Sequence, residues 1–246
     1  MSTNSLFNLY RDLIEDLFAQ VELYSEKELT LFTPGIGKEY NNNLMIVGRA
    51  VNGWTINFDK NNIREKDTII EQVSNALVTD DLQWVIDRWG NGEYDEKNKT
   101  DYNTKKSAFW RLSKHLSEEI IGNNNSVFNK IIWTNLYKVS KSAGGNPSER
   151  LADLQLERCN QILRNEIRIY NPKIIIFLTG WSWAKDFLNG IENVRVNTNT
   201  DFVEFAGKLD SSLIIVGKHP QGKPELEHFN EIINEIKSHD LIIGKN

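Results

Sequence analysis

Four short apolar runs constrain the fold more than any other feature of this sequence. They are Leu44–Gly48, Lys130–Thr134, Lys173–Leu178 and Leu213–Gly217. None of them alternates between apolar and polar residues, as a strand with one face in water would. Continuous apolar strands are typical of parallel sheets that are covered on both faces. We therefore expect an α/β protein with a central, mostly parallel four-stranded sheet.

The segments around these runs are amphipathic and predict helices. Apolar residues recur at helical spacing over residues 5–24, 69–89, 107–121, 148–170, 181–189 and 225–238. Ser148 follows Pro147 and predicts the start of the fourth helix. Strands that alternate with helices favour a three-layer α/β/α arrangement, and residues 201–208 should add an antiparallel strand before the last run.

We expect one domain over residues 1–246, because no linker interrupts the chain. Residues 33–38 resemble a phosphate loop only superficially. They lack the full spacing of that motif and no strand precedes them, so we interpret them as a turn. The polar segment at about 90–106 predicts a long surface loop.

Charge and cysteine content narrow the class of protein. A net charge of −5 argues against a protein that coats nucleic acid, although it leaves room for a local basic cleft. The single cysteine, Cys159, excludes an internal disulfide framework, and we expect it to be a buried helix residue. We interpret His115, His228 and His239, which lack metal-ligand spacing, as surface or hydrogen-bonded histidines, and we expect no metal.

Targeting signals give no reason to place the chain outside the cytoplasm. The sequence shows no signal-peptide pattern, and no apolar run approaches the length of a membrane helix. We therefore expect a cytoplasmic protein with no membrane partner, and a monomer.

Polar and glycine-rich junctions follow the four predicted strands. They cover residues 48–54, 134–138, 179–181 and 218–223. Each junction alone has a plain structural explanation, such as a tight turn, an Asn cap or an extended residue before proline. Ligands of open parallel sheets bind at the carboxyl ends of the strands, so the four junctions together predict a ligand site.

A family resemblance emerges from the same segments. They are Leu44–Gly48, Ser107–Leu112, Trp133–Lys138, Gly145–Ser148, Cys159, Asn171–Gly180 and Val216–Pro220. In this order, over about residues 44–236, the sequence resembles the uracil-DNA glycosylase superfamily, and most closely its thermostable iron–sulfur class. The resemblance implies a DNA-repair hydrolase that flips a deaminated base from the stack and cleaves its N-glycosidic bond.

The resemblance also implies roles for individual residues. Asn135 would bind the Watson–Crick edge of the base, and His219 would stabilise charge that develops on base O2. Phe58, or alternatively Trp54, would stack on the base, with Gly48 beside it. The basic residues implied as phosphate ligands are Arg49, Lys138, Lys218 and Lys223.

The sequence departs from the family pattern in the motif that follows the strand Leu44–Gly48 and in the cysteines that would bind an iron–sulfur cluster. Arg49 stands where the family has a water-orienting carboxylate or amide, and the following proline is missing, so we assign Asn52 that role. Gln221 replaces the serine of the His-Pro motif. Only Cys159 of the four cluster cysteines has a counterpart, so we expect no iron–sulfur cluster and no other cofactor.

Because Arg49 replaces the water-orienting group, two functions other than DNA base excision remain open. The chain could be an inactive module that binds a nucleobase, nucleotide or protein, with Arg49 clamping a phosphate or carboxylate. It could also be an N-glycosidase that acts on a small nucleoside. The expected partner is accordingly DNA or a small molecule that contains a nucleobase.

Overall fold

The computed structural model describes residues 3–79, 81–90, 93–95, 100–122 and 127–239. The chain divides into two compact units. The first unit comprises Met1–Pro34, Gly48–Asp80 and Thr134–Asn171, and the second comprises Gly35–Val47, Asp81–Trp133 and Pro172–Asn246. Because each unit is discontinuous in sequence, neither can be cut off at one linker. The expectation of a single domain stays a prediction.

The larger sheet, as far as the chain is described, has six strands and not the four that we predicted. Its strands in spatial order are β10 (Val203–Leu209), β11 (Ser212–Gly217), β9 (Ile174–Leu178), β3 (Leu44–Ala50), β7 (Ile131–Tyr137) and β2 (Gly35–Ile36). β11, β9 and β3 run parallel, which confirms a mixed α/β fold with a mostly parallel sheet. β10 pairs antiparallel with β11, as predicted.

The sixth strand, β2, lies within residues 33–38, where we had expected a turn. Gly35 pairs with Trp133 and Ile36 with Ile132, both antiparallel. A Cβ atom on Gly35 would lie 2.6 Å from Cδ2 of Leu82, so a larger residue here would require the buried Leu82 side chain to shift. A strand of two residues is too short to leave a periodic signal in the sequence.

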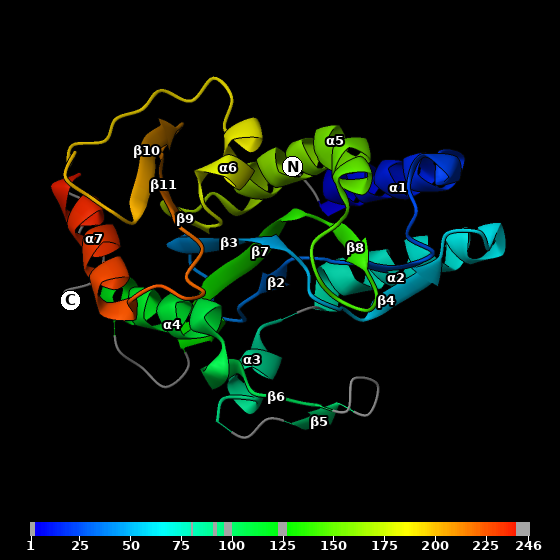
Figure 1. The fold of residues 1–246 in the computed structure, drawn as a ribbon, viewed down its shortest axis with the longest axis horizontal. Coiled ribbons are helices and arrows are strands. Elements are labelled where there is room, and N and C mark those ends of the chain that lie inside the picture. The colour runs from blue at the N-terminus through cyan, green and yellow to red at the C-terminus, as the bar shows by residue number, and fades with distance from the viewer. Residues whose placement is uncertain (1–2, 80, 91–92, 96–99, 123–126, 240–246) are drawn as a thin grey trace. The chain divides into compact units, whose positions relative to one another are not determined.

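The second unit also contains helices, 3₁₀ turns and a separate two-stranded sheet. They are α3 (Gln83–Asp87), β5 (Glu93–Asp95), β6 (Thr100–Tyr102), η3 (Thr104–Lys106), α4 (Ala108–Ile121), η4 (Val127–Lys130), α6 (Trp181–Ala184), η5 (Lys185–Phe187) and α7 (Glu225–Ser238). α7 packs against α4, β10 and β11 (Figure 1). Every residue of β9 and β11 is buried, which explains their unbroken apolar sequences.

The predicted polar loop at about 90–106 contains ordered elements. β5 and β6 form an antiparallel hairpin there, and η3 follows it. Residues 91–92 and 96–99 of this prediction lie outside the described residues.

The first unit holds a second, smaller sheet that we did not predict. In the described chain it has three antiparallel strands in the order β4 (Ile56–Asp59), β1 (Glu28–Leu31) and β8 (Val139–Lys141). Strands this short give too little pattern to be recognised alone. The unit also contains α1 (Thr3–Ala19), η1 (Val21–Leu23), η2 (Ile63–Glu65), α2 (Lys66–Thr79) and α5 (Glu149–Tyr170).

The predicted helices at 5–24, 107–121, 148–170 and 225–238 are confirmed, some with changed ends, whereas residues 181–189 hold only the short helix α6 and the 3₁₀ turn η5. α1 packs against α2 and α5, and its predicted extension to residue 24 is instead the 3₁₀ turn η1. The predicted helix 69–89 is two helices, α2 and α3. The side chain of Ser148 accepts a hydrogen bond from the Leu151 amide, so Ser148 caps α5 as predicted. A membrane-crossing helix is not found among the residues that the structure describes, where every helix is too short or too polar.

Candidate functional site

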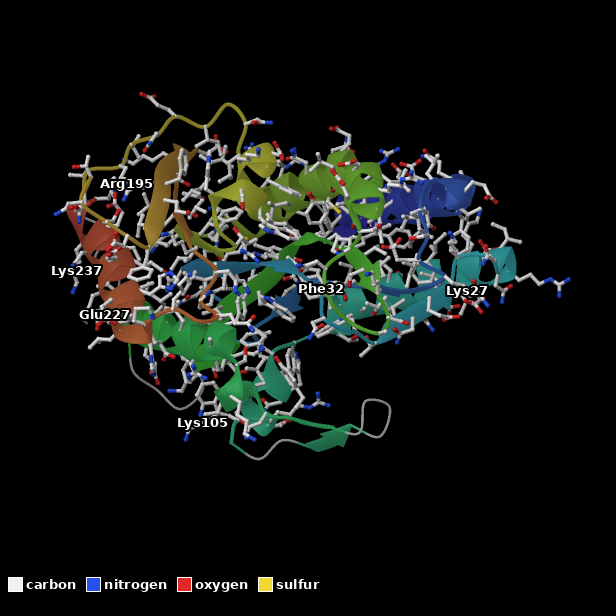
Figure 2. The ribbon with its side chains drawn as sticks, viewed as in Figure 1. Lys27, Phe32, Lys105, Arg195, Glu227 and Lys237 are labelled. Atoms are coloured by element: carbon white, nitrogen blue, oxygen red, sulfur yellow. The ribbon has the colours of Figure 1, made fainter. Side chains whose placement is uncertain are left out.

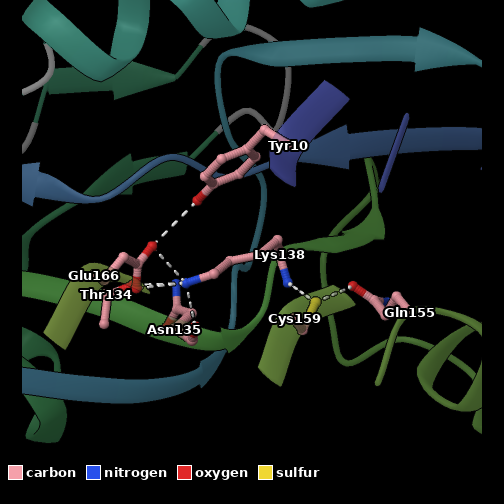
Figure 3. Close-up of polar contacts among 7 residues, drawn as sticks. All are labelled: Tyr10, Thr134, Asn135, Lys138, Gln155, Cys159 and Glu166. Atoms are coloured by element: carbon pink, nitrogen blue, oxygen red, sulfur yellow. Dashed lines mark hydrogen bonds and ion pairs between the residues drawn. The ribbon is translucent and has the colours of Figure 1, made fainter. Parts of the chain in front are cut away.

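A buried ion pair lies where β7 passes into β8 (Figure 3). Nζ of Lys138 lies 2.9 Å from Oε1 and 3.0 Å from Oε2 of Glu166, and both side chains are fully buried. The ammonium also donates to Oγ1 of Thr134 at 2.7 Å and to the main-chain oxygen of Asn135 at 2.8 Å. An ammonium has three donors. The sequence-based role of Lys138 as a phosphate ligand is therefore wrong for this conformation, because its donors are used inside the protein.

Two hydroxyl groups complete the surroundings of the Glu166 carboxylate. Thr134 Oγ1 donates to Oε2 at 2.8 Å, and the phenol of Tyr10 on α1 donates to Oε1 at 3.4 Å. Burial, followed by the nearby Glu166 charge, raises the pKa of Tyr10 well above its usual value. Tyr10 therefore remains a neutral donor at physiological pH.

Side chains of α5 satisfy the main chain at the same junction. Gln155 accepts from the amide of Val139 at 2.9 Å and donates to its carbonyl oxygen at 2.8 Å. The Cys159 sulfur accepts from the amide of Lys138 at 3.4 Å and donates to Oε1 of Gln155 at 3.3 Å. At about 100° per residue, Gln155, Cys159 and Glu166 share one face of the helix. This face fixes the course of the chain between β7 and β8.

Asn135 presents a buried amide beside this junction. Only 2% of the residue is exposed, and its Nδ2 atom has no hydrogen-bond partner within the described part of the chain. A buried donor without a partner costs about 1–3 kcal/mol. The amide therefore keeps its capacity to donate to a ligand, and its predicted role in base binding stays a prediction.

The loop after β3 is held by Asn52. Oδ1 of Asn52 accepts a hydrogen bond from the amide of Gly145 at 2.7 Å. A Cβ atom on Gly144 would lie only 2.6 Å from the same oxygen. Asn52 thus joins two loops, and the acceptor that we expected to orient a water molecule already has a main-chain donor. Arg49 is half-buried at the end of β3.

The two candidate stacking residues differ in exposure. Phe58 in β4 is only 3% exposed, and its ring centroid lies 5.7 Å from that of Phe18. It is a core residue, so the expectation that it stacks on a base is wrong for this conformation. Trp54 is half-buried, and its centroid lies 5.3 Å from that of the buried Phe32 (labelled in Figure 2). Gly48 is buried within β3.

In the second unit, His219 follows the end of β11. Its Nδ1 atom accepts a hydrogen bond from the amide of Gln221 at 3.3 Å. A neutral imidazole that accepts at Nδ1 carries its proton on Nε2. Nζ of Lys218 lies 6.0 Å from the ring centroid of Phe202, and Lys223 is exposed.

A second histidine, His228, lies beneath this loop. It is fully buried on α7 and stacks on Phe202, with centroids 5.2 Å apart. Burial, as the largest cause, lowers the pKa of His228 to about 4, and the nearby positive charges of Lys218 and Lys223 act in the same direction. Neither ring nitrogen has a hydrogen-bond partner in the region that the structure describes, so the expectation of a surface or hydrogen-bonded histidine is wrong.

The structure thus distributes the predicted residues between the two units. Asn135 lies in the first unit with the other candidates Gly48, Arg49, Asn52, Trp54, Phe58 and Lys138. His219 lies in the second unit with Lys218 and Lys223. The convergence of His219 and Asn135 on one ligand therefore stays a prediction. In the described ranges no three His, Cys, Asp or Glu residues are grouped so that they could hold a metal ion.

A groove of about 450 Å³ lies in the second unit. Its lining consists of His115, Glu118, Glu119, Glu225, Leu226 and Phe229 on α4 and α7. Glu225 contacts Arg111 and His115, while Glu118 contacts Lys114 and Glu119 contacts Lys237. The carboxylates are therefore already paired with cations of the chain, and none of the predicted site residues lines this groove.

The sequence-based reasoning missed Glu166, Gln155 and Tyr10. A signal for two of them was present. Gln155 and Glu166 fall on the same helical face as the apolar Leu151 and Ile162, where a polar residue must find a buried partner. Tyr10 lies on the apolar face of α1 and had no comparable signal.

Comparison with known proteins does not assign the chain to a family. No protein-family model matches it, and no curated protein matches its sequence.

Proposed function

We propose that this chain is an N-glycosidase of the uracil-DNA glycosylase type, which cleaves the bond between a flipped, deaminated base and its sugar in DNA. In this proposal the larger sheet is the centre of a three-layer α/β/α fold. The observation that carries the proposal is the hydrogen bond from the Gln221 amide to Nδ1 of His219. It sets the donor of the neutral imidazole on Nε2.

A fixed neutral donor suits this reaction. When the glycosidic bond breaks, the bonding electrons pass to the base, and negative charge grows on its carbonyl oxygens. A hydrogen-bond donor that is already oriented stabilises this charge without reorganisation, and loss of one such donor costs about 10²–10³-fold in rate. His219 supplies such a donor without giving up its proton.

Asn135 is the second residue on which the proposal rests. Uracil presents a carbonyl oxygen, O4, next to an N–H group, N3–H. The amide of Asn135 can donate to the first and accept from the second. Its buried Nδ2 atom, which lacks a partner in the described residues, supports this role.

The test is release of free base from oligonucleotides that contain uracil or hypoxanthine. We expect His219→Ala to lower the release rate by about 100-fold or more, because the donor is lost. The matched control is His115→Ala, a half-exposed histidine of the same unit, which should leave the rate unchanged. Background-level release by wild type and His219→Ala on every damaged base would exclude the proposal.

A binding module without chemistry is the second candidate. It is favoured by the hydrogen bond that Asn52 accepts from Gly145, and by the cation of Arg49 at the position of the expected water-orienting group. Calorimetric titration with uracil, nucleotides and abasic DNA separates the two candidates. Tight binding without turnover would support the module, whereas base release from free nucleosides alone would indicate a small-molecule N-glycosidase.

A further inference from the structure

The Lys138–Glu166 ion pair also fixes the geometry of the main chain at Asn135. Lys138 lies between β7 and β8, and its side chain folds back along β7, so that its ammonium contacts the side chain of Thr134 and the main-chain oxygen of Asn135. Hydrogen bonds from a charged donor are shorter and stronger than neutral ones. The ammonium therefore fixes the strand at the residue whose side-chain amide is buried and, within the described chain, unpartnered.

The ion pair is itself held from two other elements. Glu166 belongs to α5, and its carboxylate also accepts from Thr134 on β7 and from Tyr10 on α1. Cys159 of α5 holds the main-chain amide of Lys138 (Figure 3), and Gln155 of the same helix holds that of Val139. Lys138 consequently has little freedom to move, and neither has the carbonyl of Asn135 to which it donates.

A contribution to the stability of the fold does not by itself explain why two charged residues are buried here. Apolar residues of similar volume often stabilise a core as well as a buried ion pair does, since taking two charges out of water is costly. A buried pair can instead select one geometry, because its hydrogen bonds have defined directions. A binding amide needs such support, since misplacement by about 1 Å already weakens a site severely.

We propose that Lys138 and Glu166 are positioning residues that hold Asn135 in the orientation in which its amide binds the edge of a base. This inference rests on the proposed role of Asn135 in base binding. Lys138 itself touches no ligand and acts only through the main chain of Asn135.

The central experiment removes the pair without leaving a buried charge. The double variant Lys138→Met/Glu166→Gln is neutral and of similar volume. We expect it to fold, and we expect its dissociation constant for the base, or its KM, to rise about 10-fold or more, as for loss of other supporting contacts. The matched control is Lys27→Met, which makes the same Lys→Met change at a 65% exposed lysine of the same unit that pairs with Asp59, and should bind as wild type does.

A mutant cycle with Asn135→Ala separates positioning from a general structural effect. If the pair acts through Asn135, then Asn135→Ala weakens base binding in the wild-type background but changes it less than about 2-fold in the neutral background. Equal losses in the two backgrounds would overturn the proposal.

One readout does not depend on the proposed function. The side-chain NH₂ signals of Asn135, identified in a ¹⁵N–¹H NMR spectrum by their loss in Asn135→Ala, should shift in the neutral double variant and stay in place in Lys27→Met. If neither the wild type nor any variant binds a base, the proposed function fails, but the NMR signals of Asn135 still show whether the ion pair positions its side chain.

Should the double variant not fold, Thr134→Val, which keeps both charges, takes its place in the same spectrum, with Thr134→Ser as its control. A folded variant with unshifted Asn135 signals and wild-type binding would refute the inference.

Discussion

The ammonium of Lys138 lies 2.9 Å from Oε1 of Glu166 although the two residues are 28 positions apart, and neither side chain is exposed. Each charge depends on the other, because a lone ion in a protein interior has no water to solvate it. This relationship accounts for the burial of two residue types that are otherwise almost never buried. It also determines how the junction between β7 and β8 responds to mutation.

Lys138→Met should destabilise the protein by about 3–5 kcal/mol, because it leaves the Glu166 carboxylate buried without a counter-charge. Lys138→Met/Glu166→Gln should recover most of that loss. Urea unfolding of the three proteins measures both effects. Lys27→Met serves as the control, since Lys27 is 65% exposed and its ion pair with Asp59 should contribute less than about 1 kcal/mol. Equal stability of the single and double variants would contradict this expectation.

Gly144→Ala should cost more stability than Gly145→Ala, although both glycines have φ of 92° and suffer the same backbone strain. A Cβ atom on Gly144 would lie 2.6 Å from Oδ1 of Asn52, whereas one on Gly145 would meet nothing within 4 Å. We expect an excess of about 1–3 kcal/mol in urea unfolding, typical of an overpacked contact. In an Asn52→Ala background, which lacks that oxygen, the excess should disappear. An excess that persists there would show that the clash is not its cause.

His228 should make the protein less stable in mild acid. Burial lowers its pKa from 6.5 to about 4 in the folded state, so between these values the unfolded chain binds more protons. The contribution of the neutral ring is therefore complete above about pH 6.5, and is lost as the pH falls toward 4. At about 1.4 kcal/mol per pKa unit, the loss should be on the order of 2–3 kcal/mol.

Unfolding in urea between pH 7 and pH 4 checks this prediction. His228→Phe keeps an aromatic ring against Phe202 but cannot titrate, so it should flatten the pH dependence in this range. If the variant and the wild type lose stability in parallel, the pH dependence has another origin. Carboxylates with lowered pKa, such as Glu26 and Asp81, should give the same contribution in both proteins.

Cys159 should not react with thiol reagents in the native protein. It is fully buried, and burial raises the pKa of its thiol to about 12. At pH 8 only about one thiol in 10⁴ would be ionised, and the thiolate is the reactive form. Incubation with a colorimetric disulfide reagent should therefore release colour only after addition of guanidinium chloride. Rapid labelling of the folded protein would contradict this description of the α5 core.

The sequence alone was sufficient to predict those strands and helices whose hydrophobic pattern lies within a single segment. The runs at Lys173–Leu178 and Leu213–Gly217 became β9 and β11, and α7 has the predicted bounds of 225–238. A strand buried on both faces must be apolar throughout, and an amphipathic helix must repeat about every 3.6 residues. Both requirements act within one segment, so they can be recognised before any partner is known.

Tertiary structure alone decided the smaller sheet and the environment of the candidate residues. Leu31 in β1 pairs with Ile56 on one side and Val139 on the other, and no single one of these segments shows a strand pattern. Lys138 looked like a surface cation until Glu166 was placed beside it, and Phe58 looked available until it packed on Phe18. Whether a charge or a ring faces water depends on residues far along the chain, and pairing over such distances leaves no periodic trace in the local sequence.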